Sequence, residues 1–349
     1  MAVNCRLPAG LPRLLAITSV CSSRLRITLS LDLTALTGGT MSDDEAMARE
    51  TVLGIDIGGT KMAAALVSAD GTILTGDRIL TPAGEADEVF AALGELITRV
   101  RGDVTPMAVG IGSAGPLDQQ HGLVSPVNIA GWRNFPLVDR VRALTGDVPV
   151  ALGLDGHCFA LGEFWSGAGR DADTLLGIVV STGVGGGLVV DGRPWIGQSG
   201  NAAHIGHVVV DQDGESCACG SNGCVEAYAS GPRMVARAKR RGWRTDEDVD
   251  AAVLAADAAA GDALALAIFD DGAQALAAGI VATAVTVDLT TVVIGGGVAK
   301  AGPVLFDPVQ AWVKRLAQLP FVADLTVEPA QLDNAGLLGA AHLAWASVA

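Results

Sequence analysis

The sequence predicts an α/β protein built from two halves of similar design. Three glycine-rich turns, at residues 58–59, 183–187 and 295–297, each follow a short apolar stretch rich in Val and Ile. Such stretches are typical of buried strands, and adjacent glycines are typical of the tight turns that end them. Segments between them carry apolar residues at helical spacing, which indicates crossover helices. The 349 residues leave room for two domains.

The first half is expected to open with a strand, a glycine turn and a second strand over residues 51–69. Asp70-Gly71 then forms the next hairpin turn. The spacing of apolar residues predicts the remaining elements: a helix at 87–101, a strand at 107–112, a helix at 137–145, a strand at 148–154 and a helix at 157–166.

The second half follows the same plan. We expect a strand at 175–181, a second strand at 187–190, Ala-rich helices over 246–287 and a strand at 291–294. The third glycine turn precedes a helical stretch that begins near Pro303. No repeat of about 20–50 residues runs along the chain, which excludes solenoids and propellers.

The composition excludes several classes of protein. Half of the residues are apolar and 17% are charged, which argues against disorder, and the glycines have no triplet period, which excludes collagen. A net charge of −15 gives no electrostatic case for binding nucleic acid. Apolar runs such as 175–180 and 280–287 are interrupted well short of the ~18–20 residues that span a bilayer, so no membrane contact is expected.

The N-terminal residues differ from the rest of the chain in charge. Residues 1–40 hold four arginines and one aspartate, whereas the remainder is acidic. We expect residues 1–48 to be an unstructured extension, and whether residues 1–46 are translated stays open, with Met41 or Met47 as the working N-terminus. A short Arg-rich transit peptide is the other interpretation.

Three of the six cysteines, Cys217, Cys219 and Cys224, lie within eight residues and follow His207. One imidazole and three thiols are the ligand set of a closed tetrahedral zinc site, and a site with no open position is structural. The other interpretation is three buried thiols beside an unrelated histidine. The clustering favours a metal site and a reducing cytoplasm over a disulfide framework.

The first glycine turn has the chemistry of a phosphate site. Gly58 and Gly59 let backbone N–H groups approach a polyphosphate, and Thr60 and Lys61 follow them. Asp56, just before the turn, can hold a magnesium ion directly or through water. A plain β-hairpin is the other interpretation. The turn is no Walker loop, because the Gly-Lys-Ser/Thr ending is missing.

The two later glycine turns extend this pattern. Thr182 and Gly183 open the second turn in the same strand-turn-strand context, and the third is Gly295-Gly296-Gly297. Two opposed phosphate hairpins and a glycine-rich nucleoside turn would form a clamp from two similar halves. A separate dinucleotide fingerprint occurs at 110–115, but residues 117–122 offer no apolar helical stripe, so it is weak evidence for NAD.

Two acidic residues are candidates for the chemistry itself. Asp155 follows a predicted strand and opens a predicted helix, a position from which a carboxylate could act as general base toward an alcohol. The other interpretation is an ordinary helix N-cap. Glu226, two residues after Cys224, would be fixed by the zinc loop, and taken alone it is a solvated acid.

Together these residues resemble the ROK family of sugar kinases and sugar-responsive repressors, within the actin, Hsp70 and hexokinase superfamily. The resemblance extends from Thr51 to the C-terminus. Its motifs are Asp-x-Gly-Gly-Thr-Lys at 56–61, Gly-Ile-Gly-x-x-Gly-Pro at 110–116, Asn128 with Trp132, Asp155 with Gly162-Glu163, Ser-Thr-Gly-x-Gly-Gly-Gly at 181–187, Ile-Gly-His at 205–207, Cys-x-Cys-Gly-x-x-Gly-Cys-x-Glu at 217–226 and Ile-Gly-Gly-Gly at 294–297.

The resemblance implies an α/β, two-lobed actin-like ATPase fold with an interlobe cleft. Residues 49–158 with 336–349 would form the N-terminal lobe, and 159–335, with the zinc loop, the C-terminal lobe. The last helix, 337–347, would cross back to the first lobe. The resemblance also implies a cytoplasmic homodimer or homotetramer.

The implied activity is ATP-dependent phosphorylation of a hexose, glucose first, at its 6-hydroxyl, with Asp155 as base. ATP and Mg²⁺ would be held by Asp56, Gly58, Gly59, Thr60, Lys61, Thr182, Gly183, Gly295, Gly296 and Gly297. The hexose would contact Gly115, Asn128, Asp155, His204, His207 and Glu226. N-acetylmannosamine or another hexose or acyl-hexosamine as substrate, polyphosphate as donor, a sugar-responsive regulator and a non-catalytic sugar-binding protein are the alternatives.

Three positions depart from the family pattern and leave the hexose open. Leu154 replaces the usual Asn before the base, and Gly156-His157 replace Ala-Asn after it. His204 stands where the family has Glu, so an imidazole replaces a carboxylate contact to the sugar.

Overall fold

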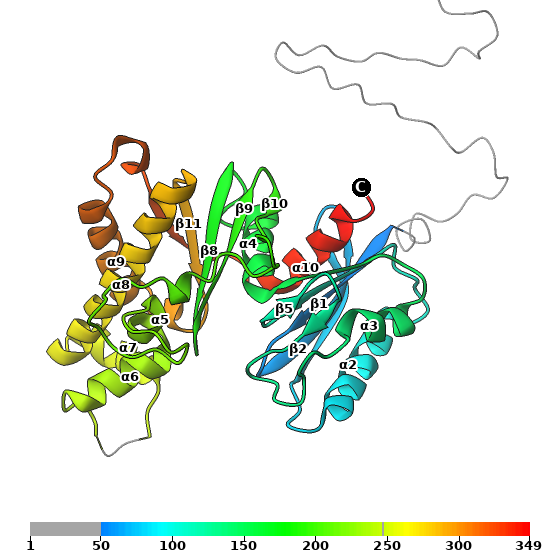
Figure 1. Cartoon of the computed structure of the whole chain (residues 1–349), viewed down its shortest axis with the longest axis horizontal. Coiled ribbons are helices and arrows are strands. Elements are labelled where there is room, and N and C mark those ends of the chain that lie inside the picture. The colour runs from blue at the N-terminus through cyan, green and yellow to red at the C-terminus, as the bar shows by residue number, and fades with distance from the viewer. Residues whose placement is uncertain (1–49, 246–247) are drawn as a thin grey trace, which may run out of the picture. The chain divides into compact units, whose positions relative to one another are not determined.

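The computed structural model describes residues 50–245 and 248–349 (Figure 1). The predicted extension at 1–48 lies outside the described residues. The described part contains two five-stranded mixed sheets and a short two-stranded hairpin. The α/β class predicted from the sequence is therefore confirmed.

The first sheet has the strand order β3-β2-β1-β4-β7. The first three strands pair antiparallel, and β1, β4 and β7 pair parallel. Their bounds are β1 (Thr51–Ile57), β2 (Lys61–Ser68), β3 (Ile73–Leu80), β4 (Val109–Ser113) and β7 (Val150–Leu154). Parallel pairing brings the carboxyl ends of β1, β4 and β7 to one edge, where Asp56, Ser113 and Leu154 lie.

Helices cover both faces of this sheet. On one face α2 (Ala86–Arg101) and α3 (Leu137–Thr145) bury their apolar sides against the strands. On the other face α10 (Ala335–Ala346) packs against β1 and β4. A Cβ at Gly110 would lie 1.7 Å from the Ala340 carbonyl oxygen, so glycine is what lets α10 approach the strand. The last helix thus packs on the first sheet.

The second sheet repeats the arrangement in the order β10-β9-β8-β11-β12. Its strands are β8 (Thr174–Val180), β9 (Val184–Val190), β10 (Arg193–Pro194), β11 (Thr291–Gly295) and β12 (Thr326–Pro329). Strands β8 and β9 are antiparallel, and β8, β11 and β12 are parallel. Both sheets therefore begin with the same strand-glycine turn-strand unit, as the sequence predicts.

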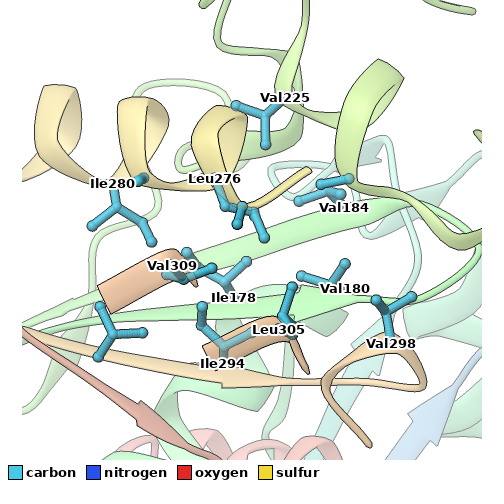
Figure 2. Close-up of a cluster of buried hydrophobic side chains, with 14 of the residues drawn as sticks. Ile178, Val180, Val184, Val225, Leu276, Ile280, Ile294, Val298, Leu305 and Val309 are labelled. Atoms are coloured by element: carbon cyan, nitrogen blue, oxygen red, sulfur yellow. The ribbon is translucent and has the colours of Figure 1, made fainter. Parts of the chain in front are cut away.

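The largest core lies on one face of the second sheet. Figure 2 shows Leu276 and Ile280 of α8 (Ala263–Val287) and Leu305 and Val309 of α9 (Pro303–Leu316) around Ile178 and Ile294 of the strands. All six side chains are at most 1% exposed. Burial of this apolar surface is the main stabilising term for this half.

Helix α4 (Asp155–Ser166) joins the two halves. It packs on β8 and β9 and also on α10, which in turn packs on the first sheet. A Cβ at Gly339 of α10 would lie 1.7 Å from the Cys158 carbonyl oxygen, so the two helices touch backbone to backbone. The first residue of α4 is thereby held next to the ends of β1 and β7.

The remaining elements are short. They are β5 (Leu117–Asp118), β6 (Leu123–Val124), η2 (Ile205–His207), α5 (Val225–Ala229), α6 (Gly231–Arg240), α7 (Ala251–Ala259), η3 (Val298–Ala301) and η4 (Pro320–Val322). The helical region predicted at 246–287 contains α7 and α8, separated at Gly261 in a left-handed conformation (φ 92°).

The expectation about apolar runs needs a correction. Helix α8 is 25 residues long, with a mean hydropathy of 1.5 over its apolar window, and passes a length and composition test for crossing a membrane. Gly272 and Gly279 lie inside this helix and do not end it. Buried core helices meet the same criteria, and 56% of this window is buried in the fold.

Candidate active site

The first glycine turn joins β1 to β2, and hydrogen bonds to Thr81 fix its backbone. The Gly58 N–H donates to the Lys61 carbonyl (3.0 Å), and the Thr81 hydroxyl donates to the Gly58 carbonyl (2.7 Å). The Thr81 N–H donates to the Thr60 carbonyl (2.9 Å). With its carbonyls engaged in this way, the turn leaves the side chains of Thr60 and Lys61 exposed. The sequence gives no signal for the part played by Thr81.

Asn128 lies directly against this turn. A Cβ at Gly59 would lie 2.3 Å from the Asn128 Cβ, so glycine is required at that position. Arg133 fixes the loop that carries Asn128, since its Nη1 donates to the carbonyls of Pro126, Ile129 and Trp132 at 2.9, 3.1 and 2.7 Å. The structure thus joins two predicted regions, the phosphate turn and a sugar contact, and adds Arg133, which no motif indicates.

Asp56 and Asp155 are neighbouring carboxyl groups, of which Asp56 is half-buried and Asp155 is exposed. Burial and the charge of Asp155 raise the pKa of Asp56 to about 6, while Lys61 acts in the opposite direction. Desolvation by the protein around its carboxyl group also raises the pKa of Asp155, and the Gly156 N–H, which donates to its Oδ1 at 2.7 Å, opposes that rise. The pair can therefore hold or release a proton nearer to neutrality than free carboxyl groups do.

The structure bears on the helix-cap interpretation of Asp155. The N-cap position of α4 is Leu154, which makes no side-chain cap, and Asp155 is the first helical residue. Its carboxylate does not cap the helix in the usual way, through the N–H groups of the second or third residue. The N-cap interpretation of Asp155 is therefore not supported.

The second glycine turn, between β8 and β9, is bound by Glu226. The Ser181 N–H closes the turn on the Gly183 carbonyl (2.8 Å). The Val184 N–H donates to Glu226 Oε2 (2.9 Å), and a Cβ at Gly183 would lie 2.7 Å from the same oxygen. A residue predicted to contact the sugar thus also fixes the turn predicted to bind phosphate.

The third glycine turn meets the second. Gly296 adopts φ 96°, and a Cβ there would lie 2.4 Å from the Val180 carbonyl oxygen. A Cβ at Gly297 would lie 3.6 Å from the Ser181 hydroxyl oxygen. The ends of β8 and β11 therefore present Thr182, Gly183 and the 295–297 turn side by side.

His204, His207 and Glu226 form one cluster. The two imidazole rings lie 6.2 Å apart at 31°. Burial and the charge of His207 lower the pKa of His204, and the charge of Glu226 raises it. His204 is therefore near both groups, as the predicted sugar site requires.

Gly115 and Leu154 lie at a second edge of the site. A Cβ at Gly115 would lie 2.6 Å from the Leu154 side chain and 3.8 Å from Asn201 Oδ1. Leu154 is 2% exposed and belongs to the core of the first half. It therefore packs as a core residue beside Gly115.

The structure contradicts the dinucleotide interpretation of residues 110–115. Gly110 and Gly112 lie inside strand β4, where they pack against α10 and Cys158, and do not form a turn. The residues that follow form the β5–β6 hairpin, so no helix N-terminus faces the end of β4 there. The literal match to the fingerprint is explained by close packing.

The donor atoms of His207, Cys217, Cys219 and Cys224 all lie within 4.8 Å of one another. His207 Nδ1 is 3.7 Å from Cys217 Sγ, and the Sγ atoms of Cys219 and Cys224 are 3.6 Å apart. These separations fit a tetrahedral ion bound at about 2.0–2.3 Å, and an N/S donor set suits Zn²⁺. The predicted ligands are brought together and fit zinc.

Protein packing builds this loop without help from a disulfide. Gly223 adopts φ 68°, and a Cβ there would lie 1.5 Å from the Asp211 carbonyl oxygen, so glycine alone fits. Burial and the neighbouring thiols raise the pKa of Cys224 to about 12, which a bound cation would offset. Helix α5 begins directly after Cys224, so the loop also sets the position of Glu226.

The ROK family model matches residues 52–347. A glucokinase from Thermotoga maritima is 36% identical over 315 residues, covering 85% of this chain and 98% of the relative. An N-acetylmannosamine kinase from Yersinia pseudotuberculosis serotype O:3 is 38% identical over 300 residues, covering 85% and 99%.

Among solved structures, a ROK family glucokinase from Streptomyces griseus in complex with glucose and AMPPNP is similar at a TM-score of 0.73. It is 33% identical, and the match covers 85% of this chain and 99% of that one. Its fold and the family match agree with the two sheets and glycine turns described above. This chain belongs to the ROK family.

Proposed function

We propose that this chain is an ATP-dependent hexose kinase that phosphorylates the 6-hydroxyl, with glucose as its substrate. One observation carries the proposal: the carboxyl group of Asp155 lies beside that of Asp56 at the end of β1, next to the first glycine turn. Family membership and the similarity to two glucokinases support it.

Asp155 is the proposed base. Its carboxylate would accept the proton of the 6-hydroxyl as that oxygen attacks the terminal phosphorus of ATP. The bond between that phosphorus and the bridging oxygen breaks, and ADP leaves with the electron pair. Desolvation by the surrounding protein raises the pKa of Asp155, which makes its carboxylate a better proton acceptor than that of a free aspartate.

The glycine turns are the proposed phosphate and nucleoside site. The backbone and side chains of Gly58, Gly59, Thr60, Lys61, Thr182 and Gly183 would hold the phosphates, and Gly295, Gly296 and Gly297 would lie against the nucleoside. Asp56 would hold Mg²⁺ directly or through water, and the ion would neutralise charge on the phosphates. Positioning and charge stabilisation would then supply most of the rate.

The sugar would lie against Gly115, Asn128, His204, His207 and Glu226. His207 has two proposed roles, because Nδ1 faces the cysteines and the rest of the ring belongs to the His204–Glu226 cluster. Zinc at His207, Cys217, Cys219 and Cys224 would be structural and would hold His207 and Glu226 in place.

A second candidate is an acyl-hexosamine kinase. His204 offers one donor and one acceptor where a glutamate would accept two hydroxyl bonds, which suits a sugar with a substituted hydroxyl. The similarity to an N-acetylmannosamine kinase supports the same substrate class. Polyphosphate in place of ATP is the alternative donor.

Two further proposals concern organisation. We propose that residues 49–158 with 336–349 form one lobe and 159–335 the other, supported by the packing of α10 on β1 and β4. We also propose a cytoplasmic homodimer or homotetramer, which light scattering of the purified chain would test. The region where a regulator would carry a DNA-binding domain lies outside the described residues.

A coupled assay for ADP release over a panel of hexoses and acyl-hexosamines tests the function. We expect turnover with glucose that requires Mg²⁺. Turnover with only an acyl-hexosamine would favour the second candidate, and turnover only with polyphosphate would replace the donor. Sugar binding without turnover on any member of the panel would contradict the kinase proposal and favour a sensor.

A further inference from the structure

His157 is a buried histidine two residues after Asp155 on α4. It is 1% exposed, and its Nε2 lies 3.0 Å from the Ala202 carbonyl oxygen. Because a carbonyl oxygen only accepts, Nε2 must carry the proton. Nδ1 is buried and finds no hydrogen-bond partner within residues 50–245 and 248–349. The single directed contact of this ring is therefore the bond to Ala202.

Ala202 lies in the segment that leads to the proposed sugar contacts. His204 follows two residues later, and η2 ends at His207. Ala203 adopts φ 63°, in the left-handed region that an alanine disfavours. Since this backbone conformation is intrinsically unfavourable for alanine, contacts with other parts of the protein must stabilise it.

Hydrogen bonds at two adjacent residues, Asn201 and Ala202, stabilise this conformation. From one side His157 donates to the Ala202 carbonyl. From the other side the Asn201 amide pairs with the backbone of Leu117, since Oδ1 accepts from the Leu117 N–H (3.1 Å) and Nδ2 donates to its carbonyl (3.0 Å). The segment is thus tied both to the helix that carries Asp155 and to β5 of the first half.

The backbone at His157 is itself fixed by close packing against β9. A Cβ at Gly187 of β9 would lie 2.6 Å from the His157 Cα and 2.2 Å from the Gly156 carbonyl oxygen. The start of α4 is therefore in backbone contact with β9, and the ring cannot follow a moving segment. Burial, with the nearby His204, also lowers the pKa of His157, so the ring stays neutral near pH 7.

We propose that His157 is a positioning residue for the sugar: its Nε2–H bond to Ala202 fixes the segment 201–207, and with it His204, relative to Asp155. The proposal rests on the proposed sugar kinase function and deepens it. It assigns a role to one of the positions at which this sequence departs from the family pattern.

The matched variants are His157→Gln and His157→Met. A glutamine amide nitrogen can occupy nearly the position of Nε2 and donate to Ala202, while methionine has the same length and no donor. We expect His157→Met to raise the hexose KM about three- to tenfold, the size of one lost neutral hydrogen bond, with kcat and the KM for ATP nearly unchanged. His157→Gln should restore the hexose KM to within about twofold of wild type.

Hydrogen exchange of residues 196–207 in the sugar-free protein gives a readout that needs no activity. We expect faster exchange there in His157→Met and wild-type exchange in His157→Gln. Equal exchange in all three proteins would overturn the positioning role, as would a hexose KM raised equally by both substitutions. If His157→Met does not fold, a raised hexose KM or faster exchange at 196–207 in His157→Gln, which keeps the donor, would still overturn the role of His157.

This design separates the two proposals. A wild-type protein that turns over no sugar would contradict the proposed function, while exchange at 196–207 would still report on the bond from His157. Turnover with an unchanged hexose KM in His157→Met would leave the kinase proposal standing and overturn the role of His157.

Discussion

The Val184 N–H donates a hydrogen bond to Glu226 Oε2 at 2.9 Å. This bond connects the start of β9, at the second glycine turn, to the helix that begins directly after the cysteine Cys224. The proposed phosphate, sugar and zinc sites therefore share one structural unit. Loss of this hydrogen bond should therefore affect both the phosphate site and the sugar site.

Glu226→Ala tests this connection. It leaves the Val184 N–H without its partner, so we expect the KM values for both ATP and hexose to rise by about tenfold. Glu226→Gln keeps an oxygen that can accept from Val184 and should raise the hexose KM alone. Steady-state kinetics with each substrate varied in turn measure both, with the exposed Glu328→Ala on β12 as control. An alanine variant with only its hexose KM changed would show that the bond to Val184 has no functional role.

Removal of one zinc ligand should have three effects together. Cys219→Ser should lose the metal, lower the melting temperature and lower activity, because the loop positions His207 and Glu226. Elemental analysis and thermal unfolding check this, and Ser221→Ala, a change in the same loop outside the ligand set, should keep the metal. Active protein purified without chelator that contains no zinc would rule out the structural role.

The Asp56 pKa predicts how stability depends on pH. Its folded pKa of about 6 lies above its ordinary value of 3.8, so protonation of Asp56 favours the folded state. This contribution is fully present below about pH 3.8 and is lost as the pH rises through about 6. A shift of about two units corresponds to roughly 3 kcal/mol.

Asp56→Asn should therefore raise the free energy of unfolding at pH 8 and change it much less at pH 4. Urea unfolding in magnesium-free buffer at both values measures the difference. An equal effect of the substitution at the two pH values would show that the charge of Asp56 is not the cause.

His204 tests sugar selectivity. His204→Glu restores a charged acceptor for sugar hydroxyls, so we expect the glucose KM to fall several-fold with the KM for ATP unchanged. Kinetics over the hexose panel would check this. A worse KM for any one sugar would instead identify that sugar as the natural substrate, with the imidazole as a favourable contact. We leave Leu154 unchanged in this test, since an asparagine there would place an amide in the core.

The sequence was most informative where local chemistry is decisive. The strand-glycine-strand units at 58–59 and 183–187 and the ligand spacing of the cysteine loop depend on neighbouring residues, and the structure has them as expected. More than one helix was predicted over 246–287, but the break at Gly261 was not located, because the alanine-rich segments on both sides of it share one helical pattern.

Contacts between distant residues could not be predicted in this way. Asn201 meets Leu117 across 84 positions, and Glu226 meets Val184 across 42. Such pairs depend on how α4, α5 and the sheets pack, and neither periodicity nor turn chemistry encodes them. The burial of Leu154 is a similar case, since its position at a strand end is compatible with a site or a core.

Asp155→Asn tests the central claim most directly, because the amide preserves the shape of the side chain and removes the base. Calorimetry should show hexose and nucleotide binding close to wild type, and the ADP-release assay should show turnover reduced by about 10²–10⁴-fold. A variant that binds both substrates and keeps more than about a tenth of wild-type turnover would contradict the assignment of Asp155 as the catalytic base.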